Sequence, residues 1–210
     1  SDQQALVVGS GPAGLECSLQ LARRGYQVTL AEAENKLGGR VLFESGLKGL
    51  SAWKRVVDNR VHEILQKNNI EVYKESRLTE DLISELGIKN IFLATGSSWR
   101  KDGVGRSRRS PIQGLESIKV YSPEEAVQNH KDIKAPIVVY DDEQGYLAGV
   151  IADHLKTKNV EVVFITPASV VSPWTDSTLE QKRVQESLIN SGVKIICNQS
   201  IYKIENATAL

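Results

Sequence analysis

Three glycines and one acidic residue near the start of the chain have the spacing of a nucleotide-binding turn. Gly9 permits a tight turn after an apolar run, and Gly14 lets the following helix pack closely against a sheet. Gly11 lacks a side chain, so a pyrophosphate can approach the backbone at the positively polarised start of that helix. Glu32 ends the next apolar run, where its carboxylate can accept hydrogen bonds from a ribose diol. The pattern predicts binding of a dinucleotide or of an adenosine diphosphate group.

The elements that must position these residues form a β-α-β unit. Apolar periodicity predicts a strand over 5–8, a helix over 13–24 and a strand over 27–32. A lone G-x-G-x-x-G motif is common in loops, and the complete order of strand, turn, helix, strand and acid is what favours nucleotide binding. The alternative is a crossover of the same shape that packs without a ligand. The predicted pyrophosphate turn consists of Gly9, Ser10, Gly11, Pro12, Ala13 and Gly14.

Two further motifs add candidate binding residues. The G-G-R sequence at 38–40 follows the acid closely, so its main chain can run near a ligand and its arginine can neutralise pyrophosphate charge. By itself this sequence is more typical of an ordinary turn with a solvated arginine. The A-T-G sequence at 94–96 ends a predicted strand at the carboxyl edge of the sheet, where ligands bind in doubly wound folds. Leu78 is expected to contact adenine through its backbone. Outside the turn, the predicted cofactor-binding residues are Glu32, Ala33, Gly38, Gly39, Arg40, Leu78, Thr95 and Gly96.

The remaining pattern predicts an α/β fold of two tandem Rossmann-like units with parallel sheets. The first unit is expected over 1–115 and the second, which resembles an NAD(P)-binding domain, over 116–210. A long loop rich in Gly, Ser and Arg, at 96–118, separates their periodic segments. The predicted helices of this part are 50–68, 79–86, 145–158 and 179–190. The predicted strands are 71–73, 90–94, 137–140, 161–165, 194–197 and 201–204.

Composition excludes several classes of function. The 210 residues carry 26 basic and 26 acidic side chains, so nothing suggests general attraction to nucleic acid or to an anionic membrane. No apolar run approaches the roughly 20 residues that span a bilayer. Cys17 and Cys197 lie far apart without a C-x-x-C motif, which favours two buried thiols in a reducing cytoplasm. The lack of methionine and the immediate start on a strand suggest an excised fragment of a longer protein.

Other polar and aromatic residues give weaker signals. The three histidines are scattered without metal-ligand spacing, so no metal site is predicted. The acids at 141–143 are more typical of a helix start than of acid–base chemistry, and no catalytic residue is predicted. Arg106, Arg108 and Arg109 contact either phosphate, an electron-transfer partner or solvent. Trp99 and Trp174 are expected to be buried against the core.

The acid, the G-G-R sequence and the A-T-G strand end, in this order, resemble the two-dinucleotide-binding flavoproteins. A closer resemblance covers nearly the whole chain and is to the C-terminal region of the trimethylamine dehydrogenase and 2,4-dienoyl-CoA reductase family. It is carried by GLKGLSAWKRVVDNR, ATGSSWRKDGVGRSRRSPIQG, VVYDDEQGYLAGVIADHL and PASVVSPWT. The loop at 99–114 and the acids after the 137–140 strand are most similar to the amine dehydrogenase branch.

This resemblance implies a larger flavin and iron-sulfur oxidoreductase. An N-terminal TIM barrel of the same chain would bind FMN beside a [4Fe–4S] cluster and act on the substrate. The region seen here would bind ADP in the amine dehydrogenases, or FAD in the dienoyl reductases, and would not catalyse the family reaction alone. Electrons would leave to a protein acceptor such as an electron-transfer flavoprotein. The alternatives are an NAD(P)H-dependent dienoyl-CoA-reductase-like enzyme and a structural or partner-docking domain that holds ADP as a static ligand.

The second unit lacks the features of a pyridine nucleotide site. After the 137–140 strand the sequence is DDEQGYLAG, so three consecutive acids stand where a pyrophosphate would bind. The next strand ends in Ile165, Thr166 and Pro167, with neither an acid for a ribose nor an arginine for a 2′-phosphate. We therefore expect that this unit does not use NADH or NADPH.

Overall fold

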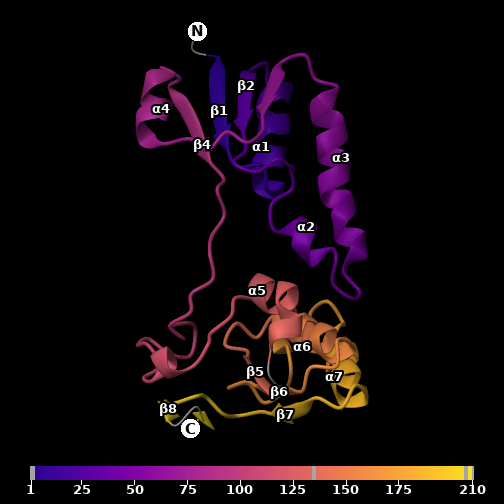
Figure 1. The fold of residues 1–210 in the computed structure, drawn as a ribbon. Coiled ribbons are helices and arrows are strands. Elements are labelled where there is room, and N and C mark those ends of the chain that lie inside the picture. Colours follow the sequence, from indigo (N-terminus) through magenta and orange to yellow (C-terminus); the bar gives the residue numbers. More distant parts are fainter. Residues whose placement is uncertain (1–2, 134–135, 206–207, 210) are drawn as a thin grey trace. The chain divides into compact units, whose positions relative to one another are not determined.

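The computed structural model describes residues 3–133, 136–205, 208 and 209, and the chain divides into two compact units, Ser1–Ser97 and Ser98–Leu210. Each unit is built on a parallel sheet with helices packed against it, which confirms the predicted α/β class (Figure 1). The sequence pattern places the division near residue 115, whereas the structure groups residues 98–115 with the second unit.

The first unit has a four-stranded parallel sheet in the order β3-β2-β1-β4. This order, with the first strand in the middle, is that of one mononucleotide-binding half of a Rossmann fold. Its strands are β1 (Gln4–Val8), β2 (Gln27–Ala31), β3 (Ile70–Tyr73) and β4 (Asn90–Leu93). Its helices are α1 (Pro12–Arg23), α2 (Val41–Glu44), the 3-10 turn η1 (Ser51–Trp53), α3 (Lys54–Leu65) and α4 (Glu80–Glu85).

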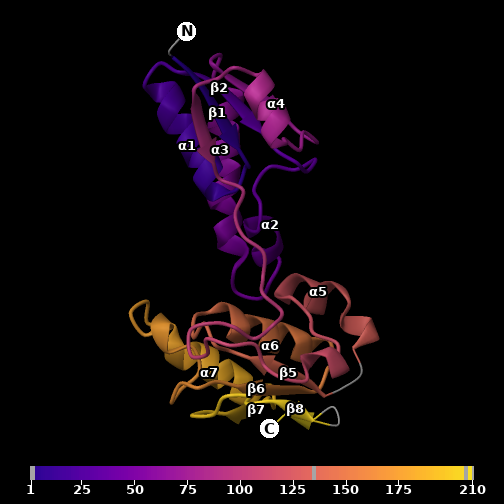
Figure 2. The same ribbon diagram turned by 90° about the vertical axis from the view of Figure 1, so that its left-hand side faces the viewer.

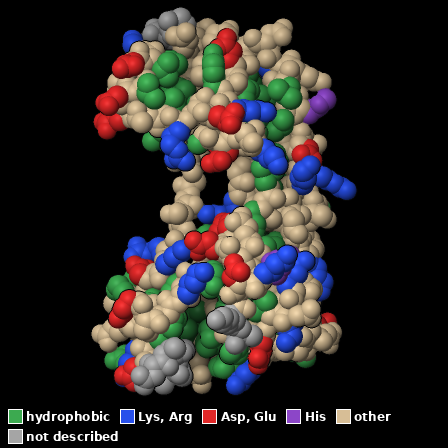
Figure 3. Space-filling model, viewed as in Figure 1, with side chains coloured by type: hydrophobic (Ala, Val, Ile, Leu, Met, Phe, Trp, Pro, Cys, Tyr) green, Lys and Arg blue, Asp and Glu red, His purple; other side chains and the backbone are tan. Residues whose placement is uncertain are grey.

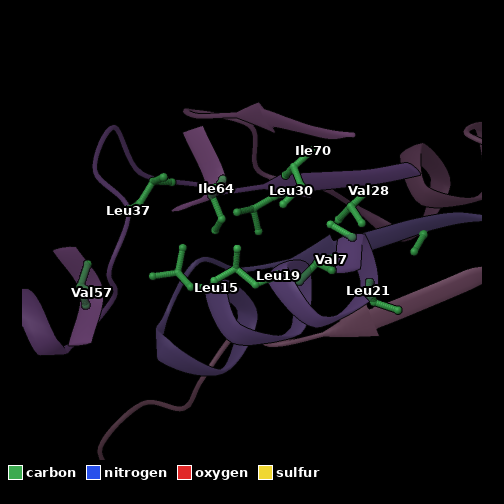
Figure 4. Close-up of a cluster of buried hydrophobic side chains, with 12 residues drawn as sticks. Val7, Leu15, Leu19, Leu21, Val28, Leu30, Leu37, Val57, Ile64 and Ile70 are labelled. Atoms are coloured by element: carbon green, nitrogen blue, oxygen red, sulfur yellow. The ribbon is translucent and has the colours of Figure 1, made fainter. Parts of the chain in front are cut away.

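Both faces of this sheet are covered. Alternate residues of β1 point to opposite faces, so Ala5 and Val7 join one apolar cluster while Leu6 and Val8 join another. α1 and α3 pack on the first face and α4 lies over the second, as Figure 2 shows. The first cluster is the larger one, and Figure 4 shows how side chains from α1, α3 and three strands converge in it. This core holds the turn between β1 and α1 in place.

Local sequence explains the start and end of α1. Pro12 occupies the first helical turn, where its missing N–H has no partner to lose and its fixed φ suits the helix. Leu15 and Leu19 lie one turn apart and are fully buried. The helix stops at Arg23, before Gly25 with a φ of +89°.

The second unit has a three-stranded parallel sheet in the order β5-β6-β7. α6 and α7 cover one face, and Ile112, Ile201 and Ile204 form a small cluster with side chains of β5 and β6. The strands are β5 (Ile137–Tyr140), β6 (Val162–Ile165) and β7 (Lys194–Ile196), with an antiparallel pair β8 (Ile204–Glu205) and β9 (Thr208–Ala209). The helices are η2 (Leu115–Ser117), α5 (Pro123–Gln128), η3 (His130–Asp132), α6 (Leu147–Thr157), η4 (Pro173–Thr175) and α7 (Gln181–Asn190).

Several predicted elements differ in extent. The predicted helix 50–68 is a 3-10 turn followed by α3, which ends at Leu65. The predicted strand 201–204 is wrong, because β8 starts at Ile204 and Ile201 packs into the apolar cluster outside any strand. α2 and α5 were not predicted. For α5 a signal exists, since Ser122 and Glu125 form a capping box around the helix start.

The surface of the first unit is apolar along one sheet edge. β4 is an edge strand whose Ile91, Phe92 and Leu93 side chains are 42%, 38% and 72% exposed. Figure 3 shows hydrophobic side chains at the surface over α4, next to acidic ones. Among the described residues, no helix combines the length and apolar character needed to cross a membrane.

Candidate functional site

The turn between β1 and α1 contains two glycines, at positions where a side chain of any other residue would collide with the backbone. Gly9 has a φ of +99°, and a Cβ added there would collide with the carbonyl oxygen of Ala94. A Cβ at Gly14 would overlap the carbonyl oxygen of Gly9. The turn, the first helix and the end of β4 are therefore in backbone contact, as the sequence pattern predicts.

Gly11 differs from these two glycines. Its φ of −63° and ψ of 176° are ordinary for any residue, and an added Cβ would meet no protein atom within 4 Å. Neither backbone strain nor packing within the described protein requires a glycine at this position. The open space lies at the start of α1, where the first N–H groups have no carbonyl partner within the helix and favour an anion.

Glu32 directly follows β2, and its carboxylate is bound to the turn. Its Oε2 accepts hydrogen bonds from the Ser10 backbone N–H at 2.8 Å and from the Ser10 hydroxyl at 2.5 Å. Its Oε1 accepts one from the backbone N–H of Glu34 at 2.9 Å. Ser10 is fully buried and Glu32 is 9% exposed. The acid predicted to hold a ribose is therefore pre-positioned beside the predicted pyrophosphate turn.

The ionisation of Glu32 is also controlled by these contacts. Burial raises the pKa of its carboxyl, but hydrogen bonds from the Ser10 side chain and from the backbone of Glu34, Ser10 and Ala33 outweigh burial. The net result is a pKa below the usual value, so the group is a charged acceptor at neutral pH.

The G-G-R sequence lies against the same turn. The Gly38 N–H donates to the Ser10 carbonyl oxygen at 2.9 Å, and a Cβ on Gly39 would lie 3.0 Å from the Gly11 Cα. Gly38 and Gly39 both have positive φ, which favours glycine. The Arg40 guanidinium donates to the Ser97 carbonyl oxygen at 2.7 Å and thereby connects this sequence to the segment after β4.

The other predicted residues lie around this centre with different exposure. Thr95 and Gly96 are exposed, and the Thr95 Cα would lie 3.1 Å from a Cβ on Gly9. Leu78 packs its side chain against the Leu6, Val8 and Ala31 cluster, which leaves its backbone as the part available for a ligand. The structure brings the turn, the acid, the G-G-R sequence and the A-T-G end together, and their roles toward a ligand stay predictions.

One contact was not predicted. Ser10 is assigned by the sequence pattern to the pyrophosphate turn, yet both of its hydrogen-bond donors go to Glu32. A hydroxyl in the middle of the glycine turn, ahead of an acid that ends the next strand, is the available signal. The glycine spacing alone draws no attention to it.

In the second unit, a buried acid follows the first strand, β5, where the first unit has the glycine turn. Asp141 follows β5, is 2% exposed, and accepts the Gln144 N–H on Oδ1 at 2.8 Å, while Oδ2 has no hydrogen-bond partner among the described residues. Burial raises the pKa of Asp141 to about 6, and the nearby Glu143 and Asp142 add to this rise against the opposing Gln144 bond.

A loop of the second unit is attached to the next acid. The Asp142 carboxylate accepts the backbone N–H groups of Arg106 and Ser107, the latter at 3.1 Å. The Arg106 guanidinium lies 4.4 Å from the centre of the Trp174 ring, in the segment after β6. Trp174 is 57% exposed, so the prediction that it is buried is wrong, because it stacks with a surface arginine instead.

Two of the remaining candidates, Arg108 and Trp99, have structural partners. Arg108 donates to the carbonyl oxygens of Ser110, Pro111 and Ile201, which orders the loop. Trp99 is half-buried and donates to Glu124. In the part of the chain that the structure describes, no three His, Cys, Asp or Glu side chains converge as metal ligands would. The thiols of Cys17 and Cys197 are free and partly buried, and burial raises the pKa of both.

Comparison with known proteins decides the family. Residues 3–209 match the sequence profile of the pyridine nucleotide-disulphide oxidoreductases. The chain belongs to this family. The parallel sheets and the turn described above are those of a flavoprotein FAD/NAD-binding domain.

Similar proteins include several amine-oxidising enzymes. Dimethylamine dehydrogenase of Hyphomicrobium sp. (strain x) is 29% identical over 212 residues, which cover 98% of this chain and 29% of that protein. The solved histamine dehydrogenase of Rhizobium sp. 4-9 is 41% identical, with a TM-score of 0.91 over 98% of this chain and 32% of that one. The 6-hydroxypseudooxynicotine amine oxidase of Pseudomonas geniculata N1 is 38% identical, with a TM-score of 0.91 over 99% of this chain and 31% of that one.

These findings confirm the resemblance to the trimethylamine dehydrogenase family within the two-dinucleotide-binding flavoproteins. The pyridine nucleotide-disulphide oxidoreductase domain described here spans less than a third of the length of these three relatives.

Proposed function

We propose that the first unit binds the ADP group of a nucleotide cofactor, either in FAD or as ADP itself. Gly11 carries this proposal, because the open space at its Cα lies at the start of α1 and beside an ionised acid. Within the described protein nothing else explains a glycine there. A pyrophosphate in that space would meet the N–H groups of the first turn of α1, and Glu32 would accept from the adenosine ribose.

The residues present fit such a group. Gly38 and Gly39 keep side chains away from the turn. The proposed role of Arg40, which follows them in the chain, is to neutralise phosphate charge. Ala33, Leu78, Thr95 and Gly96 complete the proposed contacts. The family match supports FAD, and the similarity to amine dehydrogenases keeps ADP as the other candidate.

The larger function follows from the relatives. We propose that the chain is the nucleotide-binding part of a multi-domain, cytoplasmic oxidoreductase that acts on an amine. Its coverage of under a third of each relative supports further domains in the same protein. The family resemblance implies that one of them is an N-terminal TIM barrel. FMN and a [4Fe–4S] cluster there would supply the redox chemistry, and an electron-transfer flavoprotein is the proposed acceptor. The present residues would bind and orient a nucleotide without touching the amine.

We further propose that the second unit does not use NADH or NADPH. A pyrophosphate at the end of β5 would face Asp141, Asp142 and Glu143. Two like unit charges about 5 Å apart repel by roughly 3 kcal/mol at an effective dielectric constant of about 20, whereas a helix dipole returns about 0.3–1 kcal/mol.

The loop at 105–107 supports the same proposal by occupying space. Its backbone lies on the Asp142 carboxylate and its arginine stacks on Trp174, so it bridges the segments that follow β5 and β6. Ligands of doubly wound folds bind at this carboxyl edge. The backbone N–H groups of this loop therefore occupy the Asp142 carboxylate at the sheet edge where a nucleotide would have to bind.

Three measurements test these proposals. Calorimetric titration of nucleotide-free protein with ADP should give one site per chain, and a visible spectrum of the protein as isolated distinguishes a yellow flavin from colourless ADP. No heat of binding would overturn the assignment of the first unit. Stopped-flow mixing of the intact enzyme with NADH and NADPH should show no rapid flavin reduction. Rapid reduction by either would support the dienoyl-CoA-reductase-like alternative instead.

A further inference from the structure

Ser10 uses both of its donors on one oxygen of Glu32. The backbone N–H and the hydroxyl of Ser10 reach Oε2 at 2.8 and 2.5 Å, while the hydroxyl oxygen lies 3.4 Å from the Gly38 N–H. The hydroxyl is fully buried and cannot exchange this partner for solvent. It is thus a fixed part of the acid's environment before any nucleotide binds.

Counting acceptor positions shows what remains for a ribose. An ionised carboxylate has about four positions for hydrogen-bond donors, two on each oxygen. Ser10 fills both positions of Oε2, and the Glu34 N–H fills one position of Oε1. The Ala33 backbone adds the weakest contact to this carboxylate. A ribose diol offers two hydroxyl donors, but at most one carboxylate position is left for them.

We propose that Ser10 is a specificity-determining residue that limits the ribose to one hydrogen bond with Glu32. This inference rests on the proposed binding of an ADP group by the first unit. One ribose hydroxyl donates to Oε1, and the other finds Oε2 occupied by the serine hydroxyl. Removing the serine hydroxyl opens a position on Oε2 for the second ribose hydroxyl.

The test compares ADP with 2′-deoxy-ADP and 3′-deoxy-ADP by calorimetric titration of the nucleotide-free protein. In the wild type, one deoxy analogue should bind at least about tenfold more weakly than ADP, because it loses a hydrogen bond to a charged group. The other analogue should bind within about twofold of ADP. In Ser10→Ala, the penalty for this second analogue should rise to about tenfold.

Ser18→Ala is the matched control. Ser18 is also a fully buried serine of the same segment, but its hydroxyl donates to the Gly14 carbonyl oxygen at 2.8 Å and does not contact Glu32. A serine with a merely structural role would change the affinity for all three nucleotides by the same factor. The ratio between analogues should therefore stay at its wild-type value in Ser18→Ala.

The outcomes separate this inference from the function on which it rests. If the wild type does not bind ADP, the proposed function fails. If ADP binds but the wild type penalises both deoxy analogues equally, or Ser10→Ala leaves the ratios unchanged, the role of Ser10 is overturned while nucleotide binding stands. Circular dichroism checks folding. If Ser10→Ala does not fold, Ser10→Cys carries the test, because a thiol fills similar space but is a weak donor.

Discussion

The two units share a parallel β-α-β architecture but differ at the turn that follows their first strand. In the first unit, β1 leads into glycines with open space at Gly11, and the acid stands at the end of the second strand. In the second unit, β5 leads directly into Asp141 and Asp142, and a loop of the same unit covers the latter. The same fold thus places a carboxylate at the end of the second strand in one unit and directly after the first strand in the other; in our proposal the former binds a ribose and the latter repels a phosphate.

Both acids are buried, but their surroundings stabilise the charged form of the carboxylate to different degrees. The hydrogen bonds around Glu32 keep its pKa low despite burial, so its charge is stabilised. The Asp141 carboxylate accepts one hydrogen bond among the described residues and has two acidic neighbours, and its pKa rises to about 6. The comparison shows that contacts within the first unit stabilise the charge of Glu32, whereas those within the second unit stabilise the charge of Asp141 poorly.

The largest expected effect comes from closing the space at Gly11. Gly11→Val should abolish ADP binding, a loss of more than about 100-fold, because the side chain enters the pyrophosphate position. The fold should survive, since the backbone angles suit valine and no protein atom lies within 4 Å of the new Cβ. Calorimetry measures binding and thermal unfolding measures stability.

Gly145→Val is the matched control for this change. Gly145 precedes α6 in the second unit, and a Cβ there meets no atom closer than 3.8 Å. This variant should leave ADP affinity unchanged. Wild-type affinity in a folded Gly11→Val protein would contradict the assignment of the turn.

Asp141→Asn should stabilise the second unit at neutral and alkaline pH. The folded-state pKa of Asp141, about 6, lies above the ordinary value of 3.8, so the folded state holds the proton more tightly. Stability contributed by the protonated form is present below pH 4 and lost as pH rises through 6. The amide should therefore raise the free energy of unfolding by ~1–3 kcal/mol at pH 8 and change little at pH 4.

Fluorescence of Trp99 and Trp174 follows the unfolding of this unit, since both lie in the second unit. Equal stabilisation at pH 4 and pH 8 would contradict a titrating carboxylate and would point to a packing effect instead.

Neutralising the acid of the first unit should have a smaller effect on binding. Glu32→Gln should weaken ADP binding by ~1–2 kcal/mol, because a charged acceptor to the ribose becomes neutral. The amide keeps the size of the side chain and one oxygen acceptor. An unaltered dissociation constant for ADP would rule out the ribose role of Glu32. Inorganic pyrophosphate, which has no ribose, should bind the wild type and Glu32→Gln equally.

The sequence predicts the elements whose signals are local. The first β-α-β unit is predicted to within a residue or two because the glycines, Pro12 and the apolar spacing of α1 all act within one turn. The strand 201–204 and the burial of Trp174 fail for the opposite reason. Ile201 packs into a cluster with Ile112, and Trp174 stacks on Arg106, so both depend on contacts distant in sequence.

In the candidate site of the first unit and at the end of β5, local signals are likewise predicted and contacts distant in sequence are not. Spacing brings out the glycines and Glu32, but it does not show that Ser10 fills one oxygen of that acid. Nor does it show that Asp142 holds a loop rather than facing an open crevice. Hydrogen-bond partners far apart in the chain are fixed by the packed sheet, and periodicity carries no information about them.

The smallest expected effect concerns the loop on Asp142. Asp142→Ala removes the acceptor for the N–H groups of Arg106 and Ser107. The free energy of opening the loop should fall by about 1 kcal/mol, so the open form should be populated severalfold more. Trypsin should then cleave after the arginines of this loop severalfold faster than in the wild type. Glu143→Ala is the control, because Glu143 is an exposed neighbouring acid without a hydrogen bond to this loop among those described. If both variants are cleaved at the wild-type rate, Asp142 does not hold the loop.

Binding of NADH to Asp142→Ala separates repulsion by charge from closure by the loop. If NADH still fails to bind to this variant, the remaining acids at the end of β5 suffice to exclude the nucleotide.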